Sequence, residues 1–146
     1  MKRYLILSTF CLIGNLLSAQ DYQPVNFSYS SSRISLKEAL IIITADIKPG
    51  WRLYAQNNIG PMKLEFSYPS STGSSALDST TEPLPLNSTD ETTGLQVNYF
   101  KDHVVFQQRI RTKTALTFFR GQISFTASKG DNVMGPITIP FSLMVR

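Results

Sequence analysis

The sequence predicts an all-β protein in which two antiparallel sheets face each other. In several short stretches apolar and polar residues alternate with a period of two, the pattern of half-buried strands. Charged residues make up only 16% of the 146 residues and hydrophobic residues 42%. Serine and threonine are frequent, and this composition is typical of a β-rich protein outside the cytoplasm. A chain of this length is expected to form one domain with a core of its own.

The first 19 residues have the three parts of a secretory signal peptide. A positive start, Met1-Lys2-Arg3, precedes an apolar stretch from Tyr4 to Leu17, and Ala19 provides a small residue at the cleavage position. The apolar stretch is too short for a membrane span. We therefore expect a signal peptide over residues 1–19, a single domain over residues 20–146, a periplasmic or secreted location, and no membrane span in the mature chain.

Removal of this segment changes the chemistry of the chain. Cys11, the only cysteine, lies inside it, so a mature chain has neither a thiol nor a disulfide. The 14 basic residues become 12 when Lys2 and Arg3 leave, against 10 acidic ones, so the net charge falls from +4 to +2. The sequence has no basic stripe of the kind that nucleic-acid binding needs. A zinc site is not predicted either, because the mature chain has one histidine and no cysteine.

Two strands are predicted in the first part of the mature chain. Alternation over residues 25–29 predicts the first strand, which ends at a polar break, residues 30–32. The β-branched run over residues 40–47 ends at a Pro-Gly pair and predicts a central strand covered on both sides. A helix over residues 36–40 is the competing interpretation.

The stretch from Pro49 to Gln56 is the most distinctive in the chain. It contains the only tryptophan, Trp51, which is expected to pack between the sheets. A polar loop and then an alternating strand, residues 62–68, are predicted to follow. Residues 69–94 are rich in serine, threonine and proline. They predict a long surface loop of one domain, because each flank is too short to form a core alone, with a short strand near residues 84–86.

Alternation is cleaner in the second half of the chain. Four strands are predicted: residues 95–99, 104–110, 116–127 and 137–145. The first two are separated only by a short turn, residues 100–103, which predicts a hairpin. Residues 128–135 are predicted to form a loop. Pro140 lacks a backbone donor, so the last strand is expected to lie at a sheet edge or to carry a bulge.

These seven to eight short strands, without a convincing mature helix, predict an antiparallel β-sandwich of immunoglobulin-like kind. A small barrel is the alternative.

Few residues have the pattern of a reactive site. His103 stands alone in a predicted turn and is expected to be solvated, and a serine hydrolase using it is an open alternative that no nucleophile-elbow sequence supports. A carbohydrate-binding or adhesive sandwich is another alternative, with Trp51, Tyr54 and Tyr99 as stacking rings. Exposure of Trp51 would favour the carbohydrate-binding or adhesive alternative, whereas its burial would remove the best stacking ring. No Gly-rich phosphate loop is present, and no cofactor is predicted.

Three blocks of sequence together resemble a known family. They are PGWRLYAQ at 49–56, VNYFKDHVVFQQ at 97–108 and GPITIPF at 135–141. They resemble the N-terminal domain of the thiol:disulfide interchange protein DsbD and the disulfide bond corrector family, over about residues 25–145, and the first two blocks match in order and spacing. The resemblance implies an immunoglobulin-like sandwich in the periplasm. It also implies a cysteine pair that passes electrons from a membrane partner to periplasmic thioredoxin-like proteins.

The chain departs from the pattern of that family at the cysteine pair. Aligning Pro136 with the second proline of the family pattern places Ser128 and Val133 at the two cysteine positions. Neither a hydroxyl nor an isopropyl group can undergo thiol–disulfide exchange, which needs a thiolate. Arg52 also replaces the usual histidine after the tryptophan.

The prediction is therefore a non-enzymatic module that binds a protein partner in the periplasm or envelope, with thioredoxin-like proteins among the candidates. The aromatic, histidine and methionine side chains near the predicted turns form the candidate partner surface: Tyr54, Tyr99, Phe100, His103 and Met134.

Overall fold

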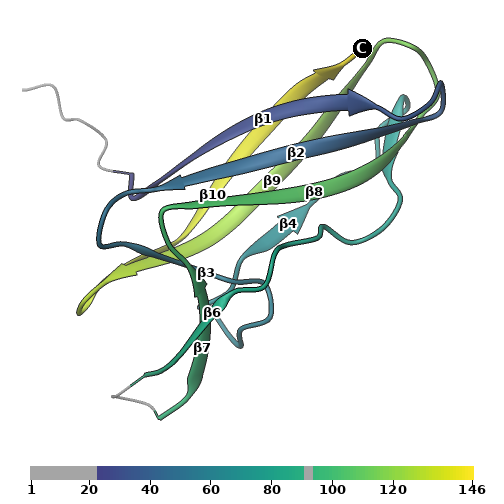
Figure 1. Ribbon diagram of the computed structural model, residues 1–146. Helices are drawn as coiled ribbons and strands as arrows, with labels where there is room; N and C mark the ends of the chain where they lie inside the picture. Colours follow the sequence, from purple (N-terminus) through teal and green to yellow (C-terminus); the bar gives the residue numbers. More distant parts are fainter. Residues whose placement is uncertain (1–22, 91–93) are drawn as a thin grey trace, which may run out of the picture.

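The computed structural model describes residues 23–90 and 94–146 (Figure 1). The predicted signal peptide, residues 1–19, lies outside the described residues. Regular structure in the described ranges is entirely β, and the strands form two antiparallel sheets, as predicted. Across these ranges no helix is long and apolar enough to cross a membrane.

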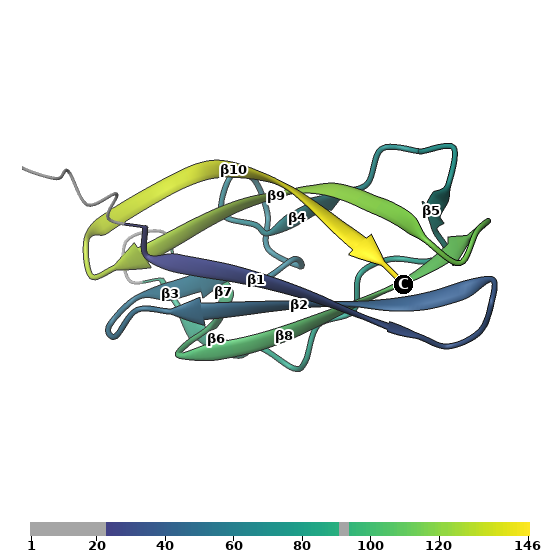
Figure 2. The same ribbon diagram turned by 90° about the horizontal axis from the view of Figure 1, so that it is seen from above.

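The two sheets form the layers of a sandwich (Figure 2). The four-stranded sheet has the order β1-β2-β8-β5, and its strands are β1 (Val25–Arg33), β2 (Glu38–Ile47), β8 (His103–Thr112) and β5 (Ser74–Ala76). The six-stranded sheet has the order β10-β9-β3-β7-β6, and β4 pairs with β9 beside this path. Its strands are β3 (Arg52–Tyr54), β4 (Glu65–Ser67), β6 (Leu86–Thr89), β7 (Gln96–Phe100), β9 (Thr117–Lys129) and β10 (Asn132–Val145).

The hydrophobic core fills the space between the sheets. Its largest fully buried side chains come from both layers and include Trp51, Phe106, Phe119, Phe125, Ile41 and Ile43. Burial of Trp51 confirms the prediction that the only tryptophan packs between the sheets. β10 is an edge strand with a register shift between Met134 and Ile137, so both features predicted from Pro140 are present.

Two expectations for the first strands are wrong. The serines of residues 30–32 continue β1, because they pair with residues 40–42 of β2 and this pairing outweighs their weak strand preference. β2 is covered on one side only: Ile41 and Ile43 are buried, whereas Ile42 is half-buried on the outer face. β2 itself begins at Glu38, so the competing helix over residues 36–40 is absent.

The hairpin predicted between the strands now labelled β7 and β8 is also wrong. The two strands are consecutive in the chain, but β7 belongs to the six-stranded sheet and β8 to the four-stranded sheet. The chain changes sheet at Asp102, which has a φ of 62°. The amide of His103 donates to the carbonyl of Lys101 at 2.7 Å, which closes a γ-turn around Asp102. This short turn therefore connects the two sheets, and β7 and β8 do not pair with each other.

The segment over residues 69–94, predicted as a surface loop, contributes to both sheets. β5 joins β8, β6 joins β7, and Thr81 bridges to Gln107. Gln108 is fully buried and anchors the segment, because it accepts a hydrogen bond from Thr80 Oγ1 at 2.8 Å and donates to the carbonyl of Asp78 at 2.9 Å. This segment therefore joins the two layers. The strand predicted over residues 62–68 is reduced to β4.

Candidate functional site

Ser128 and Val133 lie directly opposite each other at one end of the six-stranded sheet. Residues 128–135 do not form the predicted loop, because β9 continues to Lys129 and β10 begins at Asn132. Lys129 pairs with Asn132, and Ser128 pairs with Val133. The turn between them has Gly130 first, at a φ of 57°, which is the arrangement of a type II′ hairpin.

The two facing positions differ in exposure. Opposite residues of an antiparallel pair share a face, with Cβ atoms about 4.5–5.5 Å apart. The Ser128 side chain is nevertheless 6% exposed and accepts a hydrogen bond from the Tyr54 hydroxyl at 3.1 Å, whereas Val133 is 55% exposed. The position that the sequence alignment gives to one cysteine thus holds a bonded hydroxyl, and the other holds an exposed apolar group.

Arg52 covers the neighbouring part of the outer face. Its guanidinium carbon lies 4.5 Å from the centroid of the Tyr99 ring, within the range of a cation–π contact. Its Nη1 also donates to Ser88 Oγ of β6 at 3.4 Å. Arg52 itself pairs with Ser128 across β3 and β9. The arginine therefore connects β3, β6 and β7 beside the β9–β10 hairpin.

A groove of about 490 Å³ opens beside the hairpin. Its lining is largely polar: Arg52, Tyr54, Ser88, Thr89, Asp90, Val97, Ser128, Gly130 and Asp131. Charges of both signs line the groove, and none of the described residues in its lining contains sulfur. Such a surface suits hydrogen bonds and ion pairs with a polar partner.

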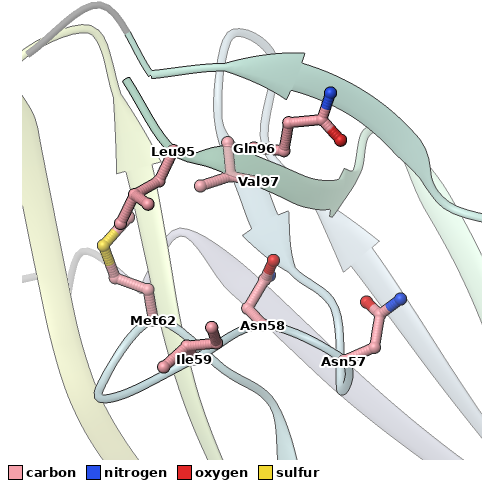
Figure 3. A pocket seen from close by; sticks show the side chains of 7 residues that line it. All are labelled: Asn57, Asn58, Ile59, Met62, Leu95, Gln96 and Val97. Atoms are coloured by element: carbon pink, nitrogen blue, oxygen red, sulfur yellow. The ribbon is translucent and has the colours of Figure 1, made fainter. Parts of the chain in front are cut away.

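A smaller apolar hollow of about 150 Å³ shares Val97 with the groove (Figure 3). Ile59 and Met62, from the loop after β3, and Leu95 and Val97, at the start of β7, provide its apolar lining. Met62 packs against a cluster of Tyr54, Val97 and Tyr99. This cluster lies on the outer face of the sheet, since Leu53 and Phe100, their neighbours along β3 and β7, belong to the main core.

The candidate partner surface predicted from the sequence does not form one surface. Tyr54, Tyr99 and Phe100 are buried, and Phe100 packs edge-on against Phe106 in the main core. Met134 is half-buried against the same core, because it pairs with Ala127 on the inner face. Packing on both faces of β3 and β7 thus buries aromatic residues that lie near turns in the sequence.

His103 is exposed, as expected, but it lies on the four-stranded sheet. Its Nδ1 is 2.8 Å from Oδ1 of Asp46, the residue opposite it on β2, and both side chains are solvent-exposed. No serine hydroxyl bonds to this ring in residues 23–90 and 94–146, so a nucleophile for the hydrolase alternative is not assembled there. The same ranges contain no group of three potential metal ligands.

Two residues of the site were missed in the sequence. Arg52 is noticeable only as a departure from the family pattern, and its position over an aromatic ring depends on the pairing of β3 with β7. Ser88 belongs to the segment predicted as a surface loop. Its nearest signal was the short strand predicted near residues 84–86, whereas the strand in the structure is β6 and extends to Thr89.

Known proteins similar to this chain are found by structure and not by sequence. No family model matches the chain. No curated protein matches its sequence. Among solved structures, the N-terminal periplasmic domain of ScsB from Proteus mirabilis superposes with a TM-score of 0.57 at 17% identity, over 88% of this chain and 49% of that one.

The DsbD N-terminal domain of Neisseria meningitidis, in its reduced form, superposes with a TM-score of 0.55 at 9% identity, over 80% of this chain and 83% of that one. The chain has the fold of a DsbD N-terminal domain. A structure of the complex between the DsbD and PilB N-terminal domains of the same organism superposes with a TM-score of 0.52 at 11% identity, over 88% of this chain and 87% of that one.

These superpositions confirm the resemblance to DsbD at the level of fold. This chain spans about half of the ScsB chain that it matches. Its sequence has a single cysteine, Cys11, so it lacks a cysteine pair.

Proposed function

We propose that this chain is a non-catalytic, periplasmic or secreted protein-binding module whose partner docks over the β9–β10 hairpin and the groove beside it. The observation that carries the proposal is the facing pair of Ser128 and Val133. The two side chains stand opposite each other across β9 and β10, yet neither contains sulfur. A DsbD-like scaffold without thiols retains a surface for association, while electron transfer through this pair is excluded.

The surface around this pair supports a protein partner. Val133 presents an exposed apolar group at the hairpin, and the groove next to it carries Arg52, Asp90 and Asp131. An apolar contact with polar and charged surroundings is the usual composition of a protein interface. We propose a periplasmic or envelope protein as the partner, and thioredoxin-like domains are the first class to test.

The two alternative functions have no such support. A carbohydrate-binding face needs exposed rings, but Trp51, Tyr54 and Tyr99 are buried. A serine hydrolase needs a nucleophile bonded to a base, and the partner of the His103 ring is the carboxylate of Asp46.

Site-specific photo-crosslinking in the native cell envelope tests the docking surface. A crosslinking residue at Val133 is expected to give a discrete adduct with one envelope protein. Thr138 is the matched control, because it lies on the same strand and is exposed but is farther from the groove. An equal pattern of adducts from both positions, or no adduct from Val133, contradicts the proposed surface.

A thiol–disulfide exchange assay on the processed protein tests the non-catalytic part separately. No turnover is expected, because the only cysteine lies at position 11. Measurable turnover contradicts the non-catalytic assignment, whatever the crosslinking result.

A further inference from the structure

At the end of the sandwich away from the β9–β10 hairpin, three turns lie together. They are the β1–β2 turn (residues 34–37), the β8–β9 turn (residues 113–116) and the segment before β5 (residues 71–73). The first two turns lie side by side near the C-terminus, whereas the β9–β10 hairpin is at the opposite end (Figures 1 and 2). We call these turns, with the adjoining strand ends at residues 33, 38, 111–112 and 117–120, the distal end.

Hydrogen bonds hold the turns of the distal end in place. The guanidinium of Arg33 donates to Thr112 Oγ1 at 2.9 Å, to the carbonyl of Thr114 at 3.0 Å and to the carbonyl of Ala115. The amide of Thr112 donates to the carbonyl of Lys37 at 2.8 Å, and the amide of Lys113 to that of Gly73 at 3.0 Å. Backbone groups of all three turns are thus bonded to one another, so their tips are preorganised.

Large apolar side chains of the distal end are exposed to solvent. Leu36 is 81% exposed in the first turn, and Leu116 is 59% exposed at the end of the second turn, directly before β9. Ile34 and Phe118 are exposed beside them, and Met144 pairs with Phe118 across β9 and β10. Single exposed apolar residues are common on protein surfaces, but a group of them at one end indicates an interaction site.

The charge of the distal end is strongly one-sided. Residues 33–38 and 111–120 contain five cations and one anion: Arg33, Lys37, Arg111, Lys113 and Arg120, against Glu38. Glu38 is itself paired with Arg109 at 2.9 Å. The third turn has no charged residue, so the field around the apolar tips is positive.

We propose that the distal end docks on the surface of a bilayer that contains anionic phospholipid. Leu36 and Leu116 enter the boundary between headgroups and acyl chains, while the adjacent Lys37 and Lys113 contact lipid phosphates. The observations favour a bilayer over an acidic protein, because cations lie beside apolar groups that are largely exposed, which is the combination that binds at the boundary between headgroups and acyl chains. Leu116 and Phe118 also line a hollow of about 310 Å³ at this end. A protein partner needs complementary packing around such groups, whereas fluid lipid does not. The inference is independent of the proposed partner at the β9–β10 hairpin, which it orients away from the membrane.

Co-sedimentation with lipid vesicles tests this proposal. The purified protein is expected to bind vesicles of phosphatidylglycerol and phosphatidylethanolamine and to bind phosphatidylcholine vesicles at least tenfold more weakly. Replacing both lysines, in K37Q/K113Q, is expected to lower the partition coefficient by about fivefold for each charge. L36S/L116S is expected to lower it at least tenfold.

The double variant I59S/L84S is the matched control. Ile59 and Leu84 are 89% and 96% exposed, so it removes as much exposed apolar surface outside the distal end. Circular dichroism verifies that every variant is folded. Binding that depends on the distal leucines and lysines but not on the control pair supports the proposal. Failure to bind anionic vesicles, as a protein-only docking site predicts, or an equal loss in I59S/L84S, overturns it.

Discussion

At the scale of single residues, the hydroxyl of Ser128 makes a buried contact beside the groove. It accepts a hydrogen bond from Tyr54, and both side chains are almost fully buried. A buried hydroxyl costs free energy unless it is bonded. The pair is therefore a structural contact under the groove as well as part of its lining.

A double-mutant cycle tests this contact. Tyr54→Phe is expected to lower the free energy of unfolding by about 1 kcal/mol, because the Ser128 hydroxyl loses its donor. Ser128→Ala is expected to cost a similar amount, and the double variant less than the sum. Tyr29→Phe is the matched control: in the described residues the buried Tyr29 hydroxyl has no hydrogen-bond partner, so its loss is expected to be neutral or stabilising. Urea denaturation measures the free energy of unfolding of all four variants. If the losses from Tyr54→Phe and Ser128→Ala are additive in the double variant, the two side chains are not coupled.

Tyr68 provides a pH-dependent prediction. Burial raises the pKa of Tyr68 to about 12, against an opposing effect of its hydrogen bond with Thr80. The unfolded chain releases this proton near pH 10 and the folded protein only near pH 12. The contribution of Tyr68 to stability is therefore complete below pH 10 and is lost as the pH rises toward 12.

Absorbance of tyrosinate measures the titration, and denaturation at several pH values measures the stability. Burial also raises the pKa of Tyr29, so Tyr68→Phe is needed to isolate the contribution of Tyr68. The variant is expected to lose less stability than the native protein between pH 10 and 12. An unchanged slope in this window contradicts the assignment.

At the scale of elements, the β9–β10 hairpin and the β7–β8 connection show opposite uses of a short turn. Gly130 begins a turn that pairs β9 with β10, and the register then brings Ser128 opposite Val133. Asp102 closes a γ-turn that sends β8 into the other sheet. Turn length alone does not distinguish the hairpin from the connection between sheets. The difference is that β9 pairs with β10, the next strand in the chain, whereas β7 does not pair with β8.

Cysteines introduced at the facing positions test the hairpin register. S128C/V133C is expected to form a disulfide on mild oxidation, because the two positions face each other and the shorter Cβ separations of such pairs, about 4.5 Å, reach the range of disulfide geometry. Closing a loop of about six residues is worth about 2 kcal/mol in the entropic model. Thiol titration detects the bond, and denaturation with and without reductant measures its effect.

K129C/V133C is the control for this pair. Lys129 is adjacent to Ser128 in β9 but points to the other face of the strand. No bond is expected in this variant. Free thiols in oxidised S128C/V133C contradict the facing register.

At the scale of the whole molecule, the segment over residues 69–94 joins the two layers. β5 and β6 extend one sheet each, and the buried Gln108 binds the segment to β8 between them. The two ends of the sandwich differ in chemistry: a polar groove and hairpin at one end, and cationic turns with exposed leucines at the other.

Gln108→Met tests the role of this anchor. The substitution keeps the volume of the side chain but removes its bonds to Thr80 and Asp78, and a loss of about 2 kcal/mol is expected from the unpaired buried groups. Limited proteolysis is expected to cut the segment 69–94 faster. Gln107→Met is the control, because Gln107 is exposed and bridges to Thr81 through its backbone. Equal effects of both substitutions contradict a specific anchor.

The fold class, most strand positions, the burial of Trp51 and the edge position of β10 were predictable from the sequence. Each depends on local information, since alternation reports which side chains share a face and a proline reports a missing donor. The positions of Ser128 and Val133 came from a resemblance of short motifs, and the hairpin register then brings them together.

The sequence by itself therefore determined the class of scaffold and the absence of a cysteine pair. Only the tertiary structure decided that β7 and β8 lie in different sheets, that Tyr54 and Tyr99 are buried, and that Arg52 covers Tyr99. The physical reason is that strand pairing is a non-local choice. Hydrogen bonds and packing with distant segments select a partner strand, and alternation within one strand contains no information about that partner.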